Sequence, residues 1–138
     1  RELRRVAHNM MPESLSRYGL KVALEDFCLS LPKVTFHFFG EDQRIDHKSE
    51  NTLYRAVFEL INNAIRHAEA EHINVQLIQQ ADRVSVTVQD DGKGFDPGMV
   101  SQGAGLKNVQ NRIGSAGGTV DIHSVTGQGT EITLEIDL

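Results

Sequence analysis

The segment DDGKGFDPG, residues 90–98, places three acidic side chains and three glycines directly after the alternating sequence RVSVTVQ. A carboxylate at the end of a strand can accept a hydrogen bond from an exocyclic amine, and neighbouring glycines let the backbone lie flat against an aromatic base. The alternative is an acidic turn facing solvent, because Asp and Gly favour turns for conformational reasons. The segment by itself leaves both interpretations open.

Two familiar ligand-binding loops do not fit this segment. A phosphate-binding loop of the type G-x-x-x-x-G-K-[ST] occurs nowhere in the chain, and no G-x-G-x-x-G motif opens a helix after a strand. A calcium loop needs a glutamate at its twelfth position, which here is Ser101 or Gln102 when counted from Asp90 or Asp91.

A long helical pattern runs from about Ser49 to Ala70 and has one apolar side. Its opposite side is polar, and there Glu59, Asn63 and His67 follow one another at intervals of one helical turn. An amide oxygen and a carboxylate suit a hard cation such as Mg²⁺ and a positioned base. The apolar side is formed by Leu53, Val57, Leu60, Ile61, Ala64, Ile65 and Ala68, and Asn62 and Arg66 complete the polar side.

Two further glycine pairs occur in GAGL, residues 103–106, and in GQGT, residues 127–130. The first opens a helical pattern, where free backbone N–H groups favour phosphates. Together with the acidic segment and the polar helix side, these are the parts of a purine nucleoside triphosphate site.

The elements that must position these residues follow from periodicity. Apolar spacing predicts helices over residues 1–11, ended by Pro12, and over 20–31, and then a strand at 33–40. After the long helix, strands are expected at 73–80 and 83–89, a glycine-led helix after 101, and a final hairpin at 119–125 and 131–138. Because short turns join adjacent strands, we expect an α/β (α+β) two-layer sandwich, a mixed and mostly antiparallel sheet with helices on one face.

Composition limits the function classes. The chain has 138 residues, a formal charge of −5 and 39 % apolar residues, which fits one globular domain and argues against a nucleic-acid or membrane-surface binder. Cys28 lies in an apolar stretch and is expected to be a buried free thiol, as in a cytoplasmic protein. No apolar stretch is long enough to span a membrane, and the opening RELRRVAHN is interpreted as a cut within a longer protein.

The segments ELINNAIRHA, DDGKGF, GAGLKNVQNR and TGQGTEITL occur in that order. They resemble the N, G1, G2 and final glycine boxes of the histidine-kinase-type ATPases with the Bergerat fold, over roughly residues 20–138. Only eight residues separate Gly94 from Gly103, which is similar to the short lid of the nitrate-sensor and membrane-fluidity-sensor branch of sensor kinases. The chaperone, gyrase and mismatch-repair relatives usually carry longer insertions there.

The resemblance implies ATP and Mg²⁺ as ligands and assigns roles residue by residue. Asp90 would bind the adenine amino group, Asn63 would be an Mg²⁺ ligand, and Glu59 would act as the base or orient a water molecule. The remaining residues would shape the pocket, contact the phosphates or close the lid: Gly92, Gly94, Thr130, Arg66, His67, Gly103, Gly105, Leu106 and Lys107. Alternatives are solvated helix charges for Arg66 and Lys107, and plain core for Phe95 and Leu106.

Two function classes follow from the resemblance. The first is the catalytic and ATP-binding domain of a sensor histidine kinase, which phosphorylates a histidine on its own dimerisation domain for relay to a response regulator. The second is a stand-alone regulatory protein such as an anti-sigma-factor serine kinase. Residues 1–18 resemble the end of the second dimerisation helix and its junction, with residues 19–138 as the catalytic domain, which favours the first class. This chain is then expected to be monomeric, the full-length kinase homodimeric, and His8 not the phosphoacceptor.

Overall fold

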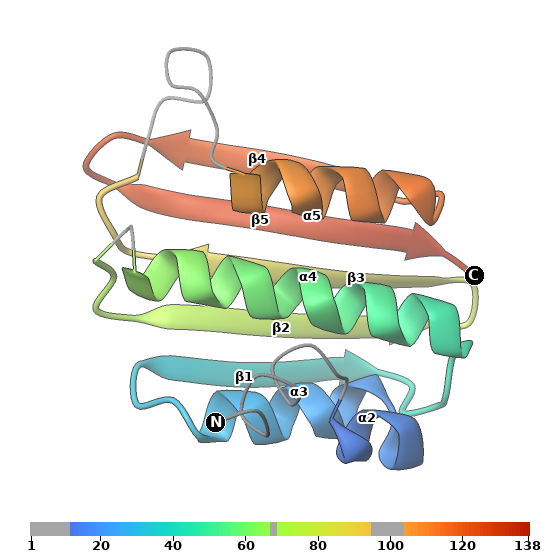
Figure 1. The fold of residues 1–138 in the computed structure, drawn as a ribbon. Helices are drawn as coiled ribbons and strands as arrows, with labels where there is room; N and C mark the ends of the chain where they lie inside the picture. Colours follow the sequence, from blue (N-terminus) through green and yellow to red (C-terminus); the bar gives the residue numbers. More distant parts are fainter. Residues whose placement is uncertain (1–11, 67–68, 95–103) are drawn as a thin grey trace, which may run out of the picture.

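The computed structural model describes residues 12–66, 69–94 and 104–138. Their centre is a five-stranded sheet in the order β1-β2-β3-β5-β4 (Figure 1). The strands are β1 (Val34–Gly40), β2 (Ile73–Gln80), β3 (Arg83–Asp90), β4 (Thr119–Val125) and β5 (Gly129–Asp137). Only the β1–β2 pair is parallel among these strands, because a helical crossover joins them, whereas the pairs joined by tight turns are antiparallel.

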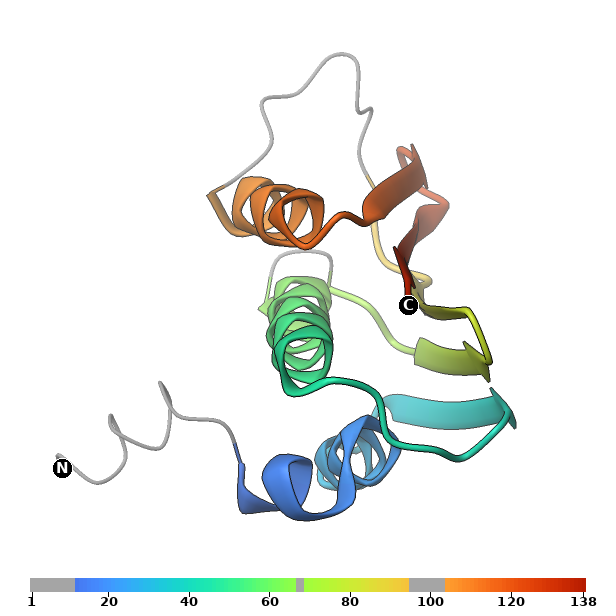
Figure 2. The same cartoon turned by 90° about the vertical axis from the view of Figure 1, so that its right-hand side faces the viewer.

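Four described helices accompany the sheet: α2 (Glu13–Tyr18), α3 (Leu20–Leu29), α4 (His47–Arg66) and α5 (Ala104–Ser115). Viewed along the sheet, all of them lie on the same face (Figure 2). The predicted two-layer architecture with a mostly antiparallel sheet is therefore confirmed.

The core lies between the two layers and follows from the alternation of the strands. In β3, for example, Val84, Val86 and Val88 are buried while the residues between them face the open side of the sheet. α4 and α5 cover these side chains with Leu60, Ile61 and Val109. Cys28 is buried as predicted, and burial raises the pKa of its thiol to about 12, which makes it unreactive.

The structure departs from the predicted elements at two helices. A further short helix, α2, follows Pro12. Proline is tolerated at the start of a helix, because backbone N–H groups there have no hydrogen-bond partner within the helix. The long helix was predicted from about Ser49 to Ala70, whereas α4 begins at His47. It does not reach Ala70, because the φ of +56° at Glu69 lies outside the right-handed helical region. Ile65, expected on the apolar side, is 40 % exposed.

The predicted helix over residues 1–11 lies outside the described residues. In the described parts of the chain, no helix is both long and apolar enough to cross a bilayer.

Candidate functional site

The four motifs come together at one end of the sheet. The end of β3, the end of α4, the start of α5 and the β4–β5 turn all lie at the left of Figure 1. Pairing of β3 with β5 places Asp90 directly opposite Thr130. The end of α4 and the β4–β5 turn, which are about 60 residues apart in sequence, therefore lie at the same end of the sheet.

Asp90 is the last residue of β3, and its side chain is half-buried. One oxygen, Oδ1, accepts a hydrogen bond from the backbone N–H of Gly92 at 2.8 Å. Burial raises the pKa of the Asp90 carboxyl, and backbone hydrogen bonds from Gly92 and Thr130 act in the opposite direction. Since a carboxylate accepts several hydrogen bonds, this group has the capacity to bind a further donor in a partly dehydrated place.

Thr130 is buried beside Asp90 and belongs to a small hydroxyl pair. Its Oγ1 lies 2.8 Å from Oγ of Ser124, which donates to the carbonyl of Gly129 at 3.2 Å. Ser124 was not among the predicted site residues. The cross-strand pairing of Ser124 with Thr130 across the final hairpin is the signal that could have identified it.

Asp91 was also not predicted, and the structure gives it a clear role. Its Oδ1 accepts hydrogen bonds from the backbone N–H groups of Glu71 at 2.8 Å and His72 at 2.9 Å, and its Oδ2 lies 3.1 Å from Nδ1 of His72. The hydrogen bonds from His72 lower the pKa of the Asp91 carboxyl to about 2, and the bond from the backbone N–H of His72 has the largest effect. This residue ties the segment after α4 to the end of β3.

The signal for Asp91 was present in the sequence. A two-residue turn at Ala81 and Asp82 fixes the register of the β2–β3 hairpin, and this register pairs Asp90 with Ile73. The next residue, Asp91, must then lie opposite His72.

The polar side of α4 carries the predicted base and metal ligand. Glu59 and Asn63 are both half-buried, while Arg66 in the last turn is exposed. α4 packs against both α5 and β3, and Glu59 and Asn63 lie in its C-terminal half. His67 lies outside the described residues.

The glycines of the acidic segment and those of the GQGT motif approach each other through the backbone. Gly92 is buried, and Gly94 has a φ of +64°, where a Cβ atom would stand 2.3 Å from the carbonyl oxygen of Val125. The N–H of Gly127 donates to the carbonyl of Lys93. The acidic segment therefore rests directly on the β4–β5 turn, and a side chain at position 94 would separate them.

The predicted lid is described only where it enters α5. Gly103 lies outside the described residues, and Gly105 belongs to the first turn of α5. Leu106 is buried and is part of the core, which agrees with the core alternative for its side chain, and Lys107 is exposed.

Among the described residues, no three His, Cys, Asp or Glu side chains gather as a metal site. The predicted arrangement does not need such a group, because Mg²⁺ in nucleotide sites is held by one or two protein ligands together with phosphates and water. The half-buried amide of Asn63 has the chemistry of such a ligand.

Comparison with known proteins is decisive for the family. Residues 48–138 match the model of the histidine kinase-, DNA gyrase B- and HSP90-like ATPases. The chain belongs to this ATPase family. The match begins in α4 and includes all four motifs, which lie between residues 59 and 134.

Two curated relatives are sensor kinases. An uncharacterized sensor-like histidine kinase of Chloroflexus aurantiacus is 34 % identical over 99 % of this chain and 25 % of its own length. The signal transduction histidine-protein kinase/phosphatase DegS of Brevibacillus brevis is 28 % identical over 99 % of this chain and 37 % of its own length. The chain thus spans between a quarter and two fifths of these relatives.

Among solved structures, the histidine kinase domain of the blue-light activated histidine kinase from Erythrobacter litoralis EL346 superposes with a TM-score of 0.68. The identity is 20 %, and the match covers 86 % of this chain and 61 % of that one, so it supports the fold. The resemblance to sensor histidine kinases is confirmed, and membership of an ATPase family supports ATP binding by this domain. The short-lid branch remains a prediction.

Proposed function

We propose that this chain is the ATP-binding catalytic domain of a two-component sensor histidine kinase. It would transfer the γ-phosphoryl group of ATP to a histidine on the kinase's own dimerisation domain, for relay to a response regulator. The observation that carries this proposal is the half-buried Asp90 carboxylate at the end of the sheet where the four family motifs meet. The curated relatives favour this function over an anti-sigma-factor serine kinase, and they favour the cytoplasmic part of a sensor as its location.

The nucleotide would lie with its base against the end of β3. Asp90 would accept a hydrogen bond from the adenine amino group, with Gly92 and Gly94 leaving room for the ring and Thr130 supporting the pocket from behind. A half-buried carboxylate suits this role, because its remaining acceptor capacity is used by an adenine donor and stays unused with a base that lacks that donor.

The triphosphate would extend from the base toward α4 and α5. Asn63 would bind Mg²⁺ and Glu59 would orient or deprotonate the attacking imidazole, so that the nitrogen–phosphorus bond forms as ADP leaves with its electron pair. Cations and backbone N–H groups would balance the phosphate charge, supplied by Arg66, His67, Lys107, Gly103 and Gly105. Leu106, whose side chain is in the core, would contribute through its backbone.

Titration calorimetry of the chain with ATP and Mg²⁺ tests this proposal. The wild-type chain should bind ATP, and Asp90→Asn should weaken binding about ten- to a hundredfold, because losing a buried charged acceptor costs about 1–3 kcal/mol. The matched control is Asp82→Asn, the same substitution in the exposed turn at the opposite end of β3. It should bind like wild type. Equal affinity of Asp90→Asn and wild type would remove Asp90 from the site.

A further inference from the structure

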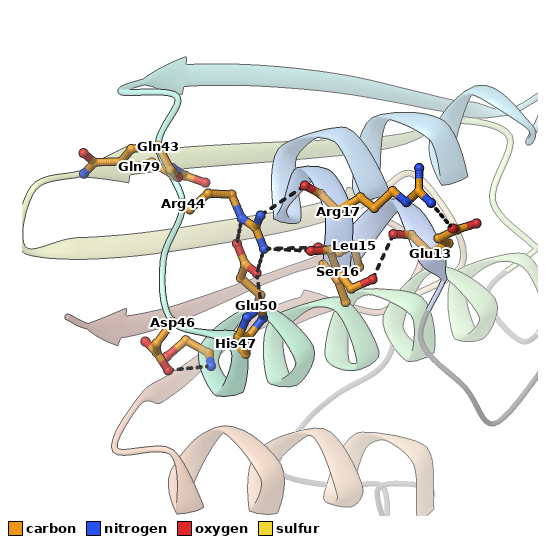
Figure 3. Close-up of polar contacts among 11 residues, drawn as sticks. Glu13, Leu15, Ser16, Arg17, Gln43, Arg44, Asp46, His47, Glu50 and Gln79 are labelled. Atoms are coloured by element: carbon orange, nitrogen blue, oxygen red, sulfur yellow. Dashed lines mark hydrogen bonds and ion pairs between the residues drawn. The ribbon is translucent and has the colours of Figure 1, made fainter.

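Arg44 lies in the loop between β1 and α4 and forms a two-pronged ion pair with Glu50 in the first turns of α4 (Figure 3). Its Nε donates to Oε2 of Glu50 at 2.9 Å and its Nη2 donates to Oε1 at 2.8 Å. The Glu50 side chain is 1 % exposed, whereas that of Arg44 is 42 % exposed. A carboxylate this deeply buried needs its cation, because breaking such a pair leaves an uncompensated charge.

The same guanidinium also holds the end of α2. Nη1 donates to the carbonyl of Arg17 at 3.2 Å, and Nη2 lies 3.4 Å from the carbonyls of Leu15 and Ser16. These carbonyls lie at the C-terminal end of α2, which is the negative end of its dipole, and the carbonyl of Leu15 also accepts from the N–H of Gly19. α2 has only six residues, too few to be stable alone, so its position depends on contacts of this kind.

Gly19 completes the arrangement between α2 and α3. It has a φ of +96°, and a Cβ atom there would lie 2.7 Å from Cδ and Nε of Arg44 and 3.1 Å from Oε2 of Glu50. The bend between the two helices therefore closes directly over the ion pair, and a side chain at this position would push them apart.

The loop that carries Arg44 is itself fixed to the sheet. Gln79 of β2 is 2 % exposed, and its Nε2 donates to the carbonyls of Glu41 at 2.9 Å and Gln43 at 2.8 Å. Arg44 is thus presented from a supported backbone. Its guanidinium contacts Glu50 of α4 and the carbonyls at the end of α2 at the same time, so it links the two helices directly.

We propose that Arg44 and Glu50 form a clamp that couples α2 to α4, so that movement of the chain before α2 is transmitted to Glu59, the proposed base. Arg44 is in this sense a positioning residue, and the inference rests on the function proposed above. Glu59 lies nine residues beyond Glu50 in one continuous helix, roughly 13 Å along its axis, and a helix transmits such a displacement as a rigid body.

The test combines two measurements on Arg44→Met, with Arg83→Met as the matched control. Arg83 forms an exposed pair with Glu135 at 3.6 Å, so the control loses an ion pair outside the clamp. In the 138-residue chain, Arg44→Met should speed hydrogen exchange of the Gly19 amide, which donates to the carbonyl of Leu15 in α2. In the full-length kinase, the rate of self-phosphorylation gives kcat and KM for ATP.

The expected result for Arg44→Met is a KM within about twofold of wild type and a kcat reduced by about 5- to 150-fold, the usual range of coupling between sites. Arg83→Met should leave both unchanged. Wild-type kcat in Arg44→Met despite faster exchange would overturn the coupling, because the pair would then only stabilise the fold. Unchanged exchange of the Gly19 amide would overturn the clamp itself.

Arg44→Lys is the second variant in case Arg44→Met does not fold. Lysine keeps the charge beside Glu50 but lacks the planar fork that reaches the carboxylate and the α2 carbonyls together. A reduced kcat supports the clamp, and a wild-type kcat contradicts it. ATP binding by the wild-type chain, measured separately by calorimetry, tests the proposed function, and the ratio of variant to wild-type kcat tests the clamp.

Discussion

Asp90 and Asp91 are neighbours in the chain, yet burial raises the pKa of Asp90 while hydrogen bonds to His72 and Glu71 lower the pKa of Asp91 to about 2. Successive side chains of a strand point to opposite faces of the sheet, so Asp90 and Asp91 face different ways. Asp90 lies on the same face as the buried valines of β3, and Asp91 binds the backbone N–H groups just before β2. The two aspartates therefore differ in their surroundings: Asp91 fastens the loop beside it, and Asp90 is the residue for which we propose the ligand contact.

For Asp91 we predict a pH-dependent contribution to stability. Its pKa falls from 3.8 in the unfolded chain to about 2 in the fold, so its stabilising effect is complete above about pH 4 and is lost as the pH falls toward 2. The difference in the free energy of unfolding between wild type and Asp91→Asn, measured with urea, should therefore shrink over this interval.

Asp121→Asn is the control for this measurement, because it removes an exposed carboxylate that contacts the His123 ring. A wild-type to Asp91→Asn difference that stays constant from pH 5 to pH 2 would contradict the role assigned to the hydrogen bonds of Asp91.

Glu59 and Asn63 lie one turn apart on the polar side of α4 and should have separable effects. In the full-length kinase, Asn63→Ala should abolish Mg²⁺-dependent nucleotide binding or activity, because it removes the proposed metal ligand. Glu59→Gln should keep nucleotide binding and slow phosphoryl transfer by about 10²–10⁴, the usual contribution of a general base. Transfer at the wild-type rate by Glu59→Gln would exclude Glu59 as the base.

At the scale of elements, α4 carries the proposed base and metal ligand and contacts α2 through Glu50 and Arg44, and its start is set by Asp46. The carbonyl of Asp46 accepts from the N–H of Glu50 at 3.0 Å, and its side chain Oδ2 accepts from the N–H of Ser49 at 3.0 Å. Asp46 is therefore the N-cap, and the bonds from Ser49 lower its pKa.

We predict that Asp46→Ala destabilises the fold by about 1 kcal/mol, the usual cost of losing an N-cap, and lowers the midpoint of thermal unfolding. Asp46→Asn is the matched control and should remain close to wild type, because asparagine caps helices about as well as aspartate. If Asp46→Ala and Asp46→Asn unfold at the same temperature, the cap does not determine the start of α4.

At the scale of the whole molecule, the domain presents a nucleotide site but, on the proposed function, the acceptor histidine belongs to another domain. His8 is the tempting acceptor, and it lies outside the described residues. It is followed by Asn9, and Pro12 follows only four residues after His8. On the proposed function the four-helix dimer is formed by the dimerisation domain, and we expect residues 1–138 alone to be monomeric.

We therefore predict that this chain binds ATP without phosphorylating itself on histidine. Incubation with γ-labelled ATP and Mg²⁺, followed by analysis of acid-labile label, should give none above background. His8→Gln is the control variant. Stoichiometric acid-labile label on the wild-type chain that disappears in His8→Gln would make His8 the acceptor and contradict this prediction.

The sequence by itself determined the layers and the family. Periods of two and 3.6 residues are local properties, so strands such as Arg83–Asp90 and the polar side of α4 follow from them. Short motifs predicted Asp90 and Thr130 as site residues, and the sheet places them opposite each other. The tertiary structure decided what depends on partners remote in sequence. Arg44 lies in a loop without a motif, and its partners at Leu15 and Arg17 are 29 and 27 residues away, while Leu106 proved to be core because α5 packs over the sheet. Local patterns cannot encode such contacts, because burial and hydrogen bonding between distant segments are settled only when the layers pack.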